Sequence, residues 1–489
     1  MILLWLAVVA PVVAGLAIVL LPSARAVLGG CIVASVIEAG LVAALVPYGA
    51  RGEVLAAGQQ LRLDPLSTYH LVLVIFVFAL SSFYAWSYFA PRVRDGSLGR
   101  ATARRFGACW SAFLASMVLV LTANNVGLMW VAMEATTLAS GLLVCLEFDR
   151  AAVRAAWTYL LICSVGIALA LLGTFVLCGA ARQVMTDQDP LLWTDLVAVA
   201  DRLPAGAAKF AFIFLLVGYG TKAGLAPLHT WLPDAHGQAP TPVSAVLSGV
   251  LLNCALYAVS RFLPIVDAAT GHSGWGTGLL IPFGLLSIVL AAAFIVHEHD
   301  VKRLLAFHSV EHLGIIALGL GVGGAAAALY HTFNHSVCKM LTFFCAGKLV
   351  QRYGTQDMRA IRGALGHSPL AGGGLLLGIL ALVGLPPFSI FMSELWIARQ
   401  GLRHDHPIAV AVFLLAAAVV FVAAVRHAVE MTQPSATPPA GPPASRGVRL
   451  LDLPLVVVPL ALLVVVGVWL PGDLRALLDA AAAVIEGGP

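Results

Sequence analysis

The chain has 489 residues, of which 60% are hydrophobic and 11% are charged, and its formal net charge is +4. Soluble domains average roughly 45–50% apolar and about 25% charged residues, so this composition favours a protein embedded in lipid and offers no basic patch for nucleic acid. The eight Cys residues occur singly, without the Cys-x-x-Cys spacing of disulfide, iron–sulfur or covalent haem motifs, so we expect no cofactor and no metal in this chain.

The first apolar segment, Ile2–Leu21, is followed by Ala24-Arg25-Ala26, which is similar to a signal-peptide cleavage site. No basic residue precedes the segment, and about 20 apolar residues are enough to cross the hydrocarbon core, so we interpret it as a transmembrane helix. It is the first of about fourteen spans predicted for an all-α polytopic membrane protein. The predicted spans are Ile2–Leu21, Val27–Val46, Tyr69–Tyr88, Phe106–Leu121, Val126–Cys145, Ala156–Gly179, Phe210–Leu232, Val243–Phe262, Leu279–Val296, Leu304–Val322, Ala325–Leu349, Gly373–Ile397, Ala409–Val425 and Leu453–Leu470.

Arg residues gather in alternate connectors and predict how the chain is oriented. Short loops rich in Arg stay in the cytoplasm, so we expect a multi-pass protein of the plasma (inner) membrane with both termini outside the cytoplasm. The connector Ala181–Ala208 lies in the opposite phase. Its Asp residues alternate with Leu, Val and Trp, which predicts an exported amphipathic helix on the membrane surface. The connectors that carry the Arg residues contain Arg92, Arg94, Arg100, Arg104, Arg105, Arg150, Arg154, Arg352, Arg359 and Arg362.

Two spans are interrupted near their middle. The seventh contains Gly224 and Pro227, and the twelfth contains Gly384 and Pro386-Pro387. Proline removes backbone hydrogen bonds, and paired broken helices are typical of inverted repeats. We therefore predict three helices in residues 1–105 and two inverted five-helix repeats in 106–262 and 279–430. Residues 431–489 would hold a loop, the last helix and a short tail, with the Pro-rich Thr432–Gly447 as a flexible cytoplasmic segment.

Only five residues of the chain are Lys, and two of them, Lys222 and Lys339, lie well inside apolar spans, away from the span ends. A charge at the centre of a span costs about 2.5–3.5 kcal/mol, so such a group indicates function. Lys can release its proton when buried, whereas Arg cannot, and Lys therefore suits a proton relay better than a static site. Glu134, in the fifth span, is the natural ion-pair partner of Lys222. The alternatives are a salt-bridged structural Lys and a static pair that holds two helices together.

His331, His335 and Lys339 recur every four residues and therefore line one helix face over about 12 Å. A row of titratable groups predicts a path for protons. The His-x-x-x-His spacing is also compatible with a metal, but no carboxylate or Cys lies nearby in the sequence to complete the site. A haem held by both His residues is less favoured still, because its ligands usually come from different helices.

Further polar residues lie at or inside the apolar spans. Glu394 follows the second interruption and is a candidate proton acceptor on the exit side. His308, Glu311 and His312 begin the tenth span, either as accessory relay groups or as ordinary interface residues. Glu38 lies deep in the second span, where the sequence identifies no basic partner for it.

Three motifs resemble the antiporter-like proton-translocating subunits shared by respiratory complex I, multisubunit cation/proton antiporters and membrane-bound hydrogenases. These motifs are Val131–Thr137, Gly220–His236 and His331–Lys339. Met133–Thr137, together with Ser309–His312, is most similar to the hydrogenase-4 component F group. The resemblance covers nearly the whole chain and implies a fourteen-helix core, in which Glu134 and Lys222 form the input pair of a proton path.

The resemblance also implies the remaining members of the path. Many proteins of the resembling family carry Lys in the eighth span, where this chain has Asn253. The bridge between the half-channels would therefore use water, His229 or another residue. The chain also stops soon after Leu470, without the long lateral helix of the largest complex I member, which favours a different member. The candidate relay residues are Glu134, Lys222, His229, His331, His335, Lys339 and Glu394, with His236, His312 and Glu311 as accessory groups.

The sequence thus predicts a proton-translocating membrane subunit of a redox complex of the hydrogenase-4 or formate hydrogenlyase kind. Electron transfer would take place in a peripheral redox module, and other membrane subunits would be its partners in the bilayer. The alternatives are a complex I proton-pumping subunit, a multisubunit sodium/proton antiporter subunit, a quinone-binding subunit and a purely structural anchor.

Overall fold

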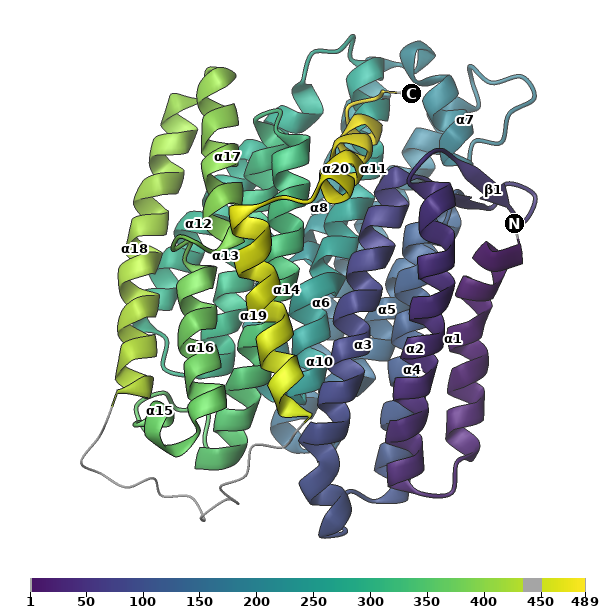
Figure 1. Cartoon of the computed structure of the whole chain (residues 1–489). Coiled ribbons are helices and arrows are strands. Elements are labelled where there is room, and N and C mark those ends of the chain that lie inside the picture. Colours follow the sequence, from purple (N-terminus) through teal and green to yellow (C-terminus); the bar gives the residue numbers. More distant parts are fainter. Residues whose placement is uncertain (1, 434–450, 489) are drawn as a thin grey trace.

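The computed structural model describes residues 2–433 and 451–488, and this part of the chain is almost entirely helical (Figure 1). Its first half contains α1 (Ile2–Leu20), α2 (Ala24–Gly49), α3 (Pro65–Arg94), α4 (Arg100–Thr122), α5 (Val126–Val144), α6 (Arg150–Ala181), α7 (Trp193–Ala198), η1 (Ala200–Arg202), α8 (Ala205–Ala223), α9 (Trp231–Gln238), α10 (Thr241–Val246), η2 (Leu247–Leu251) and α11 (Leu252–Ala269). Its second half contains α12 (Trp275–His297), α13 (Val301–Gly321), α14 (Ala325–Tyr353), α15 (Ala364–His367), α16 (Pro369–Leu382), α17 (Ser389–Arg403), α18 (Pro407–Thr432), α19 (Asp452–Val468) and α20 (Gly472–Ile485).

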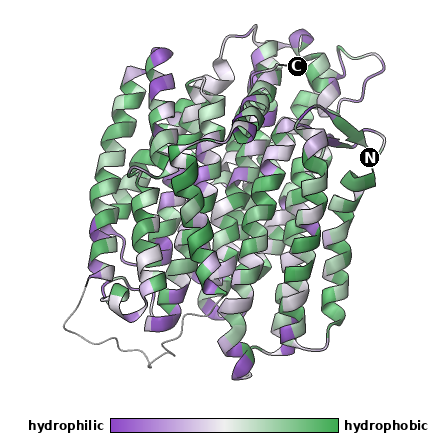
Figure 2. Cartoon of the chain, viewed as in Figure 1, coloured by the Kyte–Doolittle hydropathy of each residue, from purple (hydrophilic) through white to green (hydrophobic). Residues whose placement is uncertain are grey.

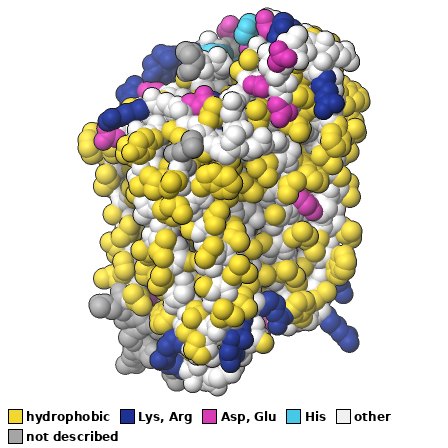
Figure 3. Space-filling model, turned by 90° about the vertical axis from the view of Figure 1, so that its right-hand side faces the viewer, with side chains coloured by type: hydrophobic (Ala, Val, Ile, Leu, Met, Phe, Trp, Pro, Cys, Tyr) yellow, Lys and Arg dark blue, Asp and Glu magenta, His cyan; other side chains and the backbone are white. Residues whose placement is uncertain are grey.

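The long helices stand side by side, and both ends of the chain lie at the same end of the assembly (Figure 1). Hydrophobic residues dominate the middle of these helices, and hydrophilic residues concentrate at their ends (Figure 2). The face drawn in Figure 3 has a hydrophobic middle, with most charged side chains at its two ends. Lipid-facing positions must be apolar, so this distribution confirms a multi-pass membrane protein.

Ten helices of the described chain are long and apolar enough to cross a membrane. The pair α19 and α20, bent by 78°, raises this number to at most eleven, fewer than the fourteen predicted. The difference has a physical cause. Helix α14 is long but carries His331, His335 and Lys339, and the segment of α16 and α17 is divided into two short pieces. Hydropathy and length alone therefore do not identify them as spans.

Each predicted interruption coincides with a helix end. Helix α8 ends at Ala223, Gly224 follows with φ +76°, and α9 begins only at Trp231. Helix α16 ends at Leu382, and Gly384 has φ +70° before α17 begins. Glycine adopts this left-handed conformation without the clash that a Cβ would cause, which explains its presence at both ends.

The predicted eighth span is continuous from α10 through η2 to α11, with Asn253 just after η2. The element η2 is a π-helical turn, and such turns occur frequently at functional sites. The eighth span is therefore irregular next to Asn253, the position where the resemblance led us to expect Lys.

Two connectors differ from prediction. Strands β1 (Val54–Ala56) and β2 (Leu61–Leu63) form an antiparallel hairpin, so the described chain is not purely helical. Between the end of α6 and the start of α8, the connector Ala181–Ala208 contains only the short α7 and η1. Trp193 of α7 is buried rather than displayed on a surface helix. This burial is compatible with its indole nitrogen, which donates a hydrogen bond to the carbonyl of Arg261 at 2.6 Å.

The tail after Leu470 forms α20, which packs against α3, α11 and α14. Its Leu478, Ala481 and Ile485 are buried, so one face of this helix packs against the other helices. Most of the predicted flexible loop Thr432–Gly447 lies outside the described residues.

Candidate functional site

The first candidate site lies where α5, α6 and α8 meet. Lys222 is fully buried, and its Nζ donates hydrogen bonds to Thr137 Oγ1 at 2.9 Å and to Tyr159 OH at 2.5 Å. The Thr137 hydroxyl in turn can donate to Glu134 Oε2 at 3.3 Å or to the Met133 carbonyl of its own helix at 3.4 Å. The sequence suggested a direct ion pair, but within the described chain Glu134 and Lys222 form no salt bridge within 4.0 Å. Thr137 connects them instead.

Further hydroxyl groups surround this site. Ser164 on α6 donates to Glu134 Oε1 at 2.6 Å, and Tyr159 OH lies 2.7 Å from Ser140 Oγ. The Tyr159 ring packs against Trp231, with 4.5 Å between ring centroids. A hydroxyl both donates and accepts, so this arrangement can pass a proton between the Lys222 ammonium and the Glu134 carboxylate by small rotations.

The second candidate site lies between α13, α14 and α17. His312 Nδ1 is 2.9 Å from His331 Nε2, and His331 Nδ1 is 2.9 Å from Ser393 Oγ. The Ser393 hydroxyl donates its hydrogen to the Ile390 carbonyl, so its oxygen must accept the hydrogen bond from His331 Nδ1. In neutral rings, His331 Nε2 is then an acceptor and His312 Nδ1 its donor. The remaining nitrogen, His312 Nε2, is a buried acceptor without a partner among the described residues.

Two carboxylates flank these histidines. Glu311 Oε2 is 2.8 Å from His308 Nδ1 on the same helix. Glu394 comes from α17 and brings a carboxylate oxygen within 4.8 Å of ring nitrogens of His312 and His331. Gly384 makes this approach possible, because a Cβ at that position would collide with Glu394 Oε2.

The same side chains form two overlapping groups with metal-ligand spacing, in which all ligand atoms lie within 4.8 Å of one another. Folding thus supplies the carboxylates that the sequence did not place near the His-x-x-x-His spacing. However, His312 Nδ1 and His331 Nε2 share one hydrogen, and His331 Nδ1 is bonded to Ser393. The arrangement therefore fits proton transfer better than ligation. The two groups are His308, Glu311 and His312, and His312, His331 and Glu394.

His335 and Lys339, the other two residues of the row on α14, make different contacts. The His335 ring lies 5.3 Å from the His312 ring, and both its nitrogens are buried without a partner among the described residues. Lys339 Nζ donates to the Leu305 carbonyl of α13 at 2.6 Å. His312 therefore hydrogen-bonds His331 and lies beside the His335 ring without a hydrogen bond, whereas Lys339 is held by the backbone of the neighbouring helix.

His229 and His236 stand apart from both sites. His229 lies in the break between α8 and α9, with its ring 6.2 Å from that of Phe294. His236 stacks on Phe343 at 5.3 Å, and neither of its nitrogens has a partner in the described chain. Within the described residues no hydrogen bond joins either histidine to the relay groups. No direct contact therefore supports His229 as the bridge between the two half-channels.

Sequence reasoning missed several polar groups. Tyr159, Ser164 and Ser393 had no distinguishing signal, because hydroxyl residues are frequent in helices. A buried ion pair was also missed, in which Arg261 donates to the two carboxylate oxygens of Asp64 at 2.5 and 2.8 Å. The position of Arg261 inside a predicted apolar span was a signal that could have found this pair.

Buried titratable groups within a multi-pass helical assembly mark membrane proteins that move ions or protons. The chain belongs to the family described as NADH:quinone oxidoreductase/Mrp antiporter, TM, whose model matches residues 123–420. This range contains Glu134, Lys222, His331 and Glu394. The match confirms the family predicted from the three motifs.

Individual proteins agree with this membership. The chain is 41% identical over 335 residues to the hydrogenase-4 component F homolog of Methylacidiphilum infernorum (isolate V4), covering 68% of this chain and 70% of the relative. It is 31% identical over 356 residues to hydrogenase-4 component B of Escherichia coli (strain K12), covering 70% of this chain but 51% of that protein, about half its length. The predicted likeness to the hydrogenase-4 group is therefore confirmed.

Among solved structures, a chain of the membrane-bound sulfane sulfur reductase, an archaeal respiratory membrane complex, superposes with a TM-score of 0.86. The match covers 99% of this chain and 97% of that chain at 21% sequence identity, so it shows a shared fold. Similar chains thus occur as membrane subunits of multisubunit complexes.

Proposed function

We propose that the chain is a proton-translocating membrane subunit of a multisubunit redox complex of the hydrogenase-4 kind. One observation carries this proposal. His312, His331 and Ser393 form a chain of hydrogen bonds that all point in one direction, with a vacant acceptor nitrogen at its start. A proton that binds His312 Nε2 can displace the Nδ1 hydrogen to His331 Nε2. The resulting His331 imidazolium can then give up a proton to the carboxylate of Glu394, an oxygen of which lies within 4.8 Å of a His331 ring nitrogen.

The site at Lys222 supplies the switch in this proposal. While Glu134 is ionised, it stabilises the Lys222 ammonium through Thr137. A proton that reaches Glu134 removes this stabilisation and favours release of the Lys222 proton. The protonation of one side chain is thereby coupled to that of the other, and the released proton moves on toward the histidines.

We further propose that α8 with α9, α14, α16 with α17, and α19 also cross the membrane, giving fourteen spans with inverted repeats in residues 106–262 and 279–430. The breaks after Ala223 and Leu382, five predicted spans apart, support this arrangement. The Arg-rich connectors support an orientation with both termini outside the cytoplasm in the plasma membrane. Accessibility of single Cys residues placed in the α3–α4 and α11–α12 connectors would test this orientation.

The peripheral redox module and neighbouring membrane subunits would be the partners of this chain. The hydrogenase-4 names of its relatives support this assignment, and the family description keeps a complex I or Mrp antiporter role as the alternative. Purification of the native complex, followed by identification of its subunits, distinguishes the hydrogenase and complex I assignments. An antiporter would show proton flux that depends on sodium, whereas the proposed subunit would not.

The decisive experiment compares two substitutions of Lys on α8. Lys222→Met removes the buried ammonium but keeps a side chain of similar length, and Lys209→Met makes the same change near the helix start, where Lys209 lies over the Trp275 ring. In vesicles that contain the native complex, Lys222→Met should abolish proton movement and Lys209→Met should leave it unchanged. Proton movement at the wild-type rate in Lys222→Met, with the subunit present, would refute the proposal.

A further inference from the structure

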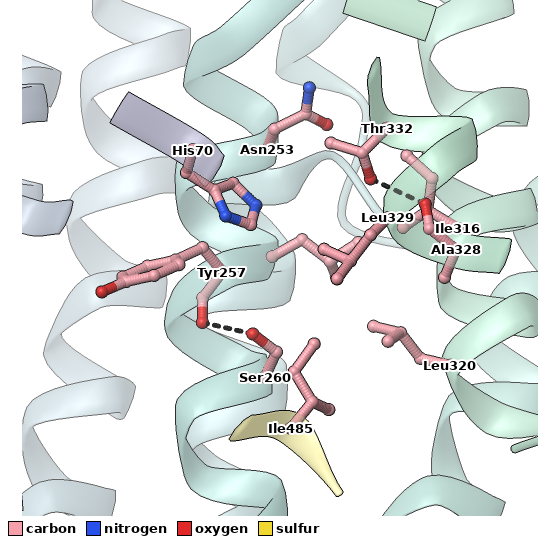
Figure 4. Close-up of a pocket in the computed structure, with 11 residues that line it drawn as sticks. His70, Asn253, Tyr257, Ser260, Ile316, Leu320, Ala328, Leu329, Thr332 and Ile485 are labelled. Atoms are coloured by element: carbon pink, nitrogen blue, oxygen red, sulfur yellow. Dashed lines mark hydrogen bonds between the residues drawn. The ribbon is translucent and has the colours of Figure 1, made fainter. Parts of the chain in front are cut away.

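A small cavity lies between α3, α11, α13 and α14, next to the histidine site (Figure 4). About 10 Å³ is available in it to the centre of a water molecule, which is roughly the space that one buried water needs. Ile485 of α20 lines the cavity beside Ser260, so the C-terminal helix forms part of its wall. Its polar lining consists of His70, Asn253, Tyr257, Ser260 and Thr332.

The geometry of His70 fixes which of its nitrogens can accept a proton. His70 Nδ1 lies 2.9 Å from the carbonyl oxygen of Leu66, and because a carbonyl only accepts, Nδ1 carries the hydrogen. In the neutral ring, Nε2 is therefore an acceptor, and it has no hydrogen-bond partner among the described residues. The ring projects into the cavity from α3 (Figure 4).

The opposite wall of the cavity belongs to the relay helix. Thr332 follows His331 in α14, and Asn253 Nδ2 donates to Ser336 Oγ of the same helix at 2.8 Å. Asn253 Oδ1 is buried and unpartnered in the described chain. An unpartnered buried oxygen next to a cavity of this size is a position where a water molecule would bind.

The other titratable groups close to His70 are less suited to carry a proton. The Tyr69 and Tyr257 rings each lie 5.0 Å from the His70 ring, and a phenol keeps its hydrogen near neutral pH. Arg261 is bound by Asp64, which also pairs with Arg62 at 3.2 Å, and Arg62 in turn pairs with Glu53 at 3.0 Å. These two Arg and two acidic side chains balance each other in charge. The walls contributed by α13, α14 and α20 contain no titratable residue in the described lining.

We propose that this cavity is an outward branch of the proton path and that His70 carries the proton through it, an inference that rests on the proposed function. A protonated water held by Asn253 and Thr332 transfers its proton to His70 Nε2, which gives an imidazolium and a neutral water. The imidazolium keeps its Nδ1 hydrogen on the Leu66 carbonyl and transfers the new proton from Nε2 to a second water, which enters on the side of Ser260 and Ile485. That water leaves as hydronium, and His70 returns to the neutral ring. In this branch, His70 and a water beside Asn253 carry the proton at the position where the resemblance led us to expect Lys.

The test uses His70→Asn in the native complex in vesicles. Asparagine cannot take up a proton, so proton movement should fall by about tenfold or more. His272→Asn is the matched control, because His272 lies exposed in the α11–α12 connector and should leave the rate unchanged. Thr332→Val keeps the shape of the side chain and removes one hydroxyl from the cavity, so it should slow proton movement as well.

Rescue separates proton transfer from a structural role. In His70→Ala, added imidazole should restore proton movement, whereas it should leave His272→Ala unaffected. A wild-type rate in His70→Asn would overturn the proposed outward branch. A lack of rescue in His70→Ala, with the subunit present in full amount, would overturn it as well. If Lys222→Met stops proton movement in the same experiments, only the proposed branch is wrong. If Lys222→Met also retains the wild-type rate, the proposed function itself fails.

Discussion

His312 donates its Nδ1 hydrogen to Nε2 of His331 across 2.9 Å, from α13 to α14. The direction follows from Ser393, which accepts from His331 on the far side and donates to the Ile390 carbonyl. One serine therefore sets the tautomers of two histidines, and the imidazoles are ordered for transfer in one direction.

Ser393→Ala should disorder this chain of hydrogen bonds. It removes the acceptor of His331 Nδ1 and leaves a buried N–H unpaired, at a cost of about 1–3 kcal/mol, so proton movement should slow while the complex still assembles. The rate of acidification in vesicles, measured over a range of pH, is the appropriate readout.

Ser389→Ala is the control on the same helix. The Ser389 hydroxyl is also buried, but it has no hydrogen-bond partner in the described chain. Its removal should leave proton movement unchanged. Equal rates for Ser393→Ala and Ser389→Ala would show that the tautomer of His331 does not matter.

The Thr137 hydroxyl is predicted to couple Lys222 to Glu134. Thr137→Val keeps the shape of the side chain but removes this connection, so the switch should operate more slowly, by about tenfold for one lost hydrogen bond to a charged group. Thr136→Val is the neighbouring control, because its hydroxyl donates to the Met133 carbonyl at 2.6 Å and, unlike that of Thr137, contacts neither Lys222 nor Glu134. If both variants slow proton movement alike, Thr137 has no special part in the coupling.

Much of the membrane fold was predictable because apolar segments of spanning length are a direct consequence of bilayer thickness. The interruptions at Gly224 and Gly384 were also predictable, since glycine and proline disturb helices by known sterics. The hairpin of β1 and β2 was missed because three residues per strand leave no periodic pattern. The connector with Trp193 was misjudged because its burial depends on a contact with Arg261, which is distant in the sequence.

The site was predictable in its residue types but not in its connections. Lys222, His331 and Glu394 were conspicuous because polar groups are costly in an apolar span. That Thr137 lies between Lys222 and Glu134, and that His312 meets His331, depends on how neighbouring helices are rotated about their axes. A single sequence does not encode this rotation in any local pattern.

The buried pair of Asp64 and Arg261 is expected to contribute to stability. Asp64→Asn leaves the Arg261 charge buried without its partner, which should cost about 3–5 kcal/mol and lower the melting temperature of the complex in detergent. Asp357 forms a pair with Arg359 on an exposed connector, where water screens the charges, so Asp357→Asn should cost far less stability. Similar losses in both variants would show that burial does not govern the strength of the pair.

The approach of Glu394 to the histidines should depend on the absence of a side chain at Gly384. Gly384→Ala has two effects, because its φ of +70° disfavours a Cβ by about 1–2 kcal/mol and that Cβ would displace the Glu394 carboxylate. Gly354→Ala isolates the first effect, since Gly354 also has φ +70° but a Cβ there meets no atom within 4 Å. Both variants should lose similar stability from backbone strain, and only Gly384→Ala should also lose proton movement. Unimpaired proton movement in Gly384→Ala would mean that the position of Glu394 beside His312 and His331 is not required.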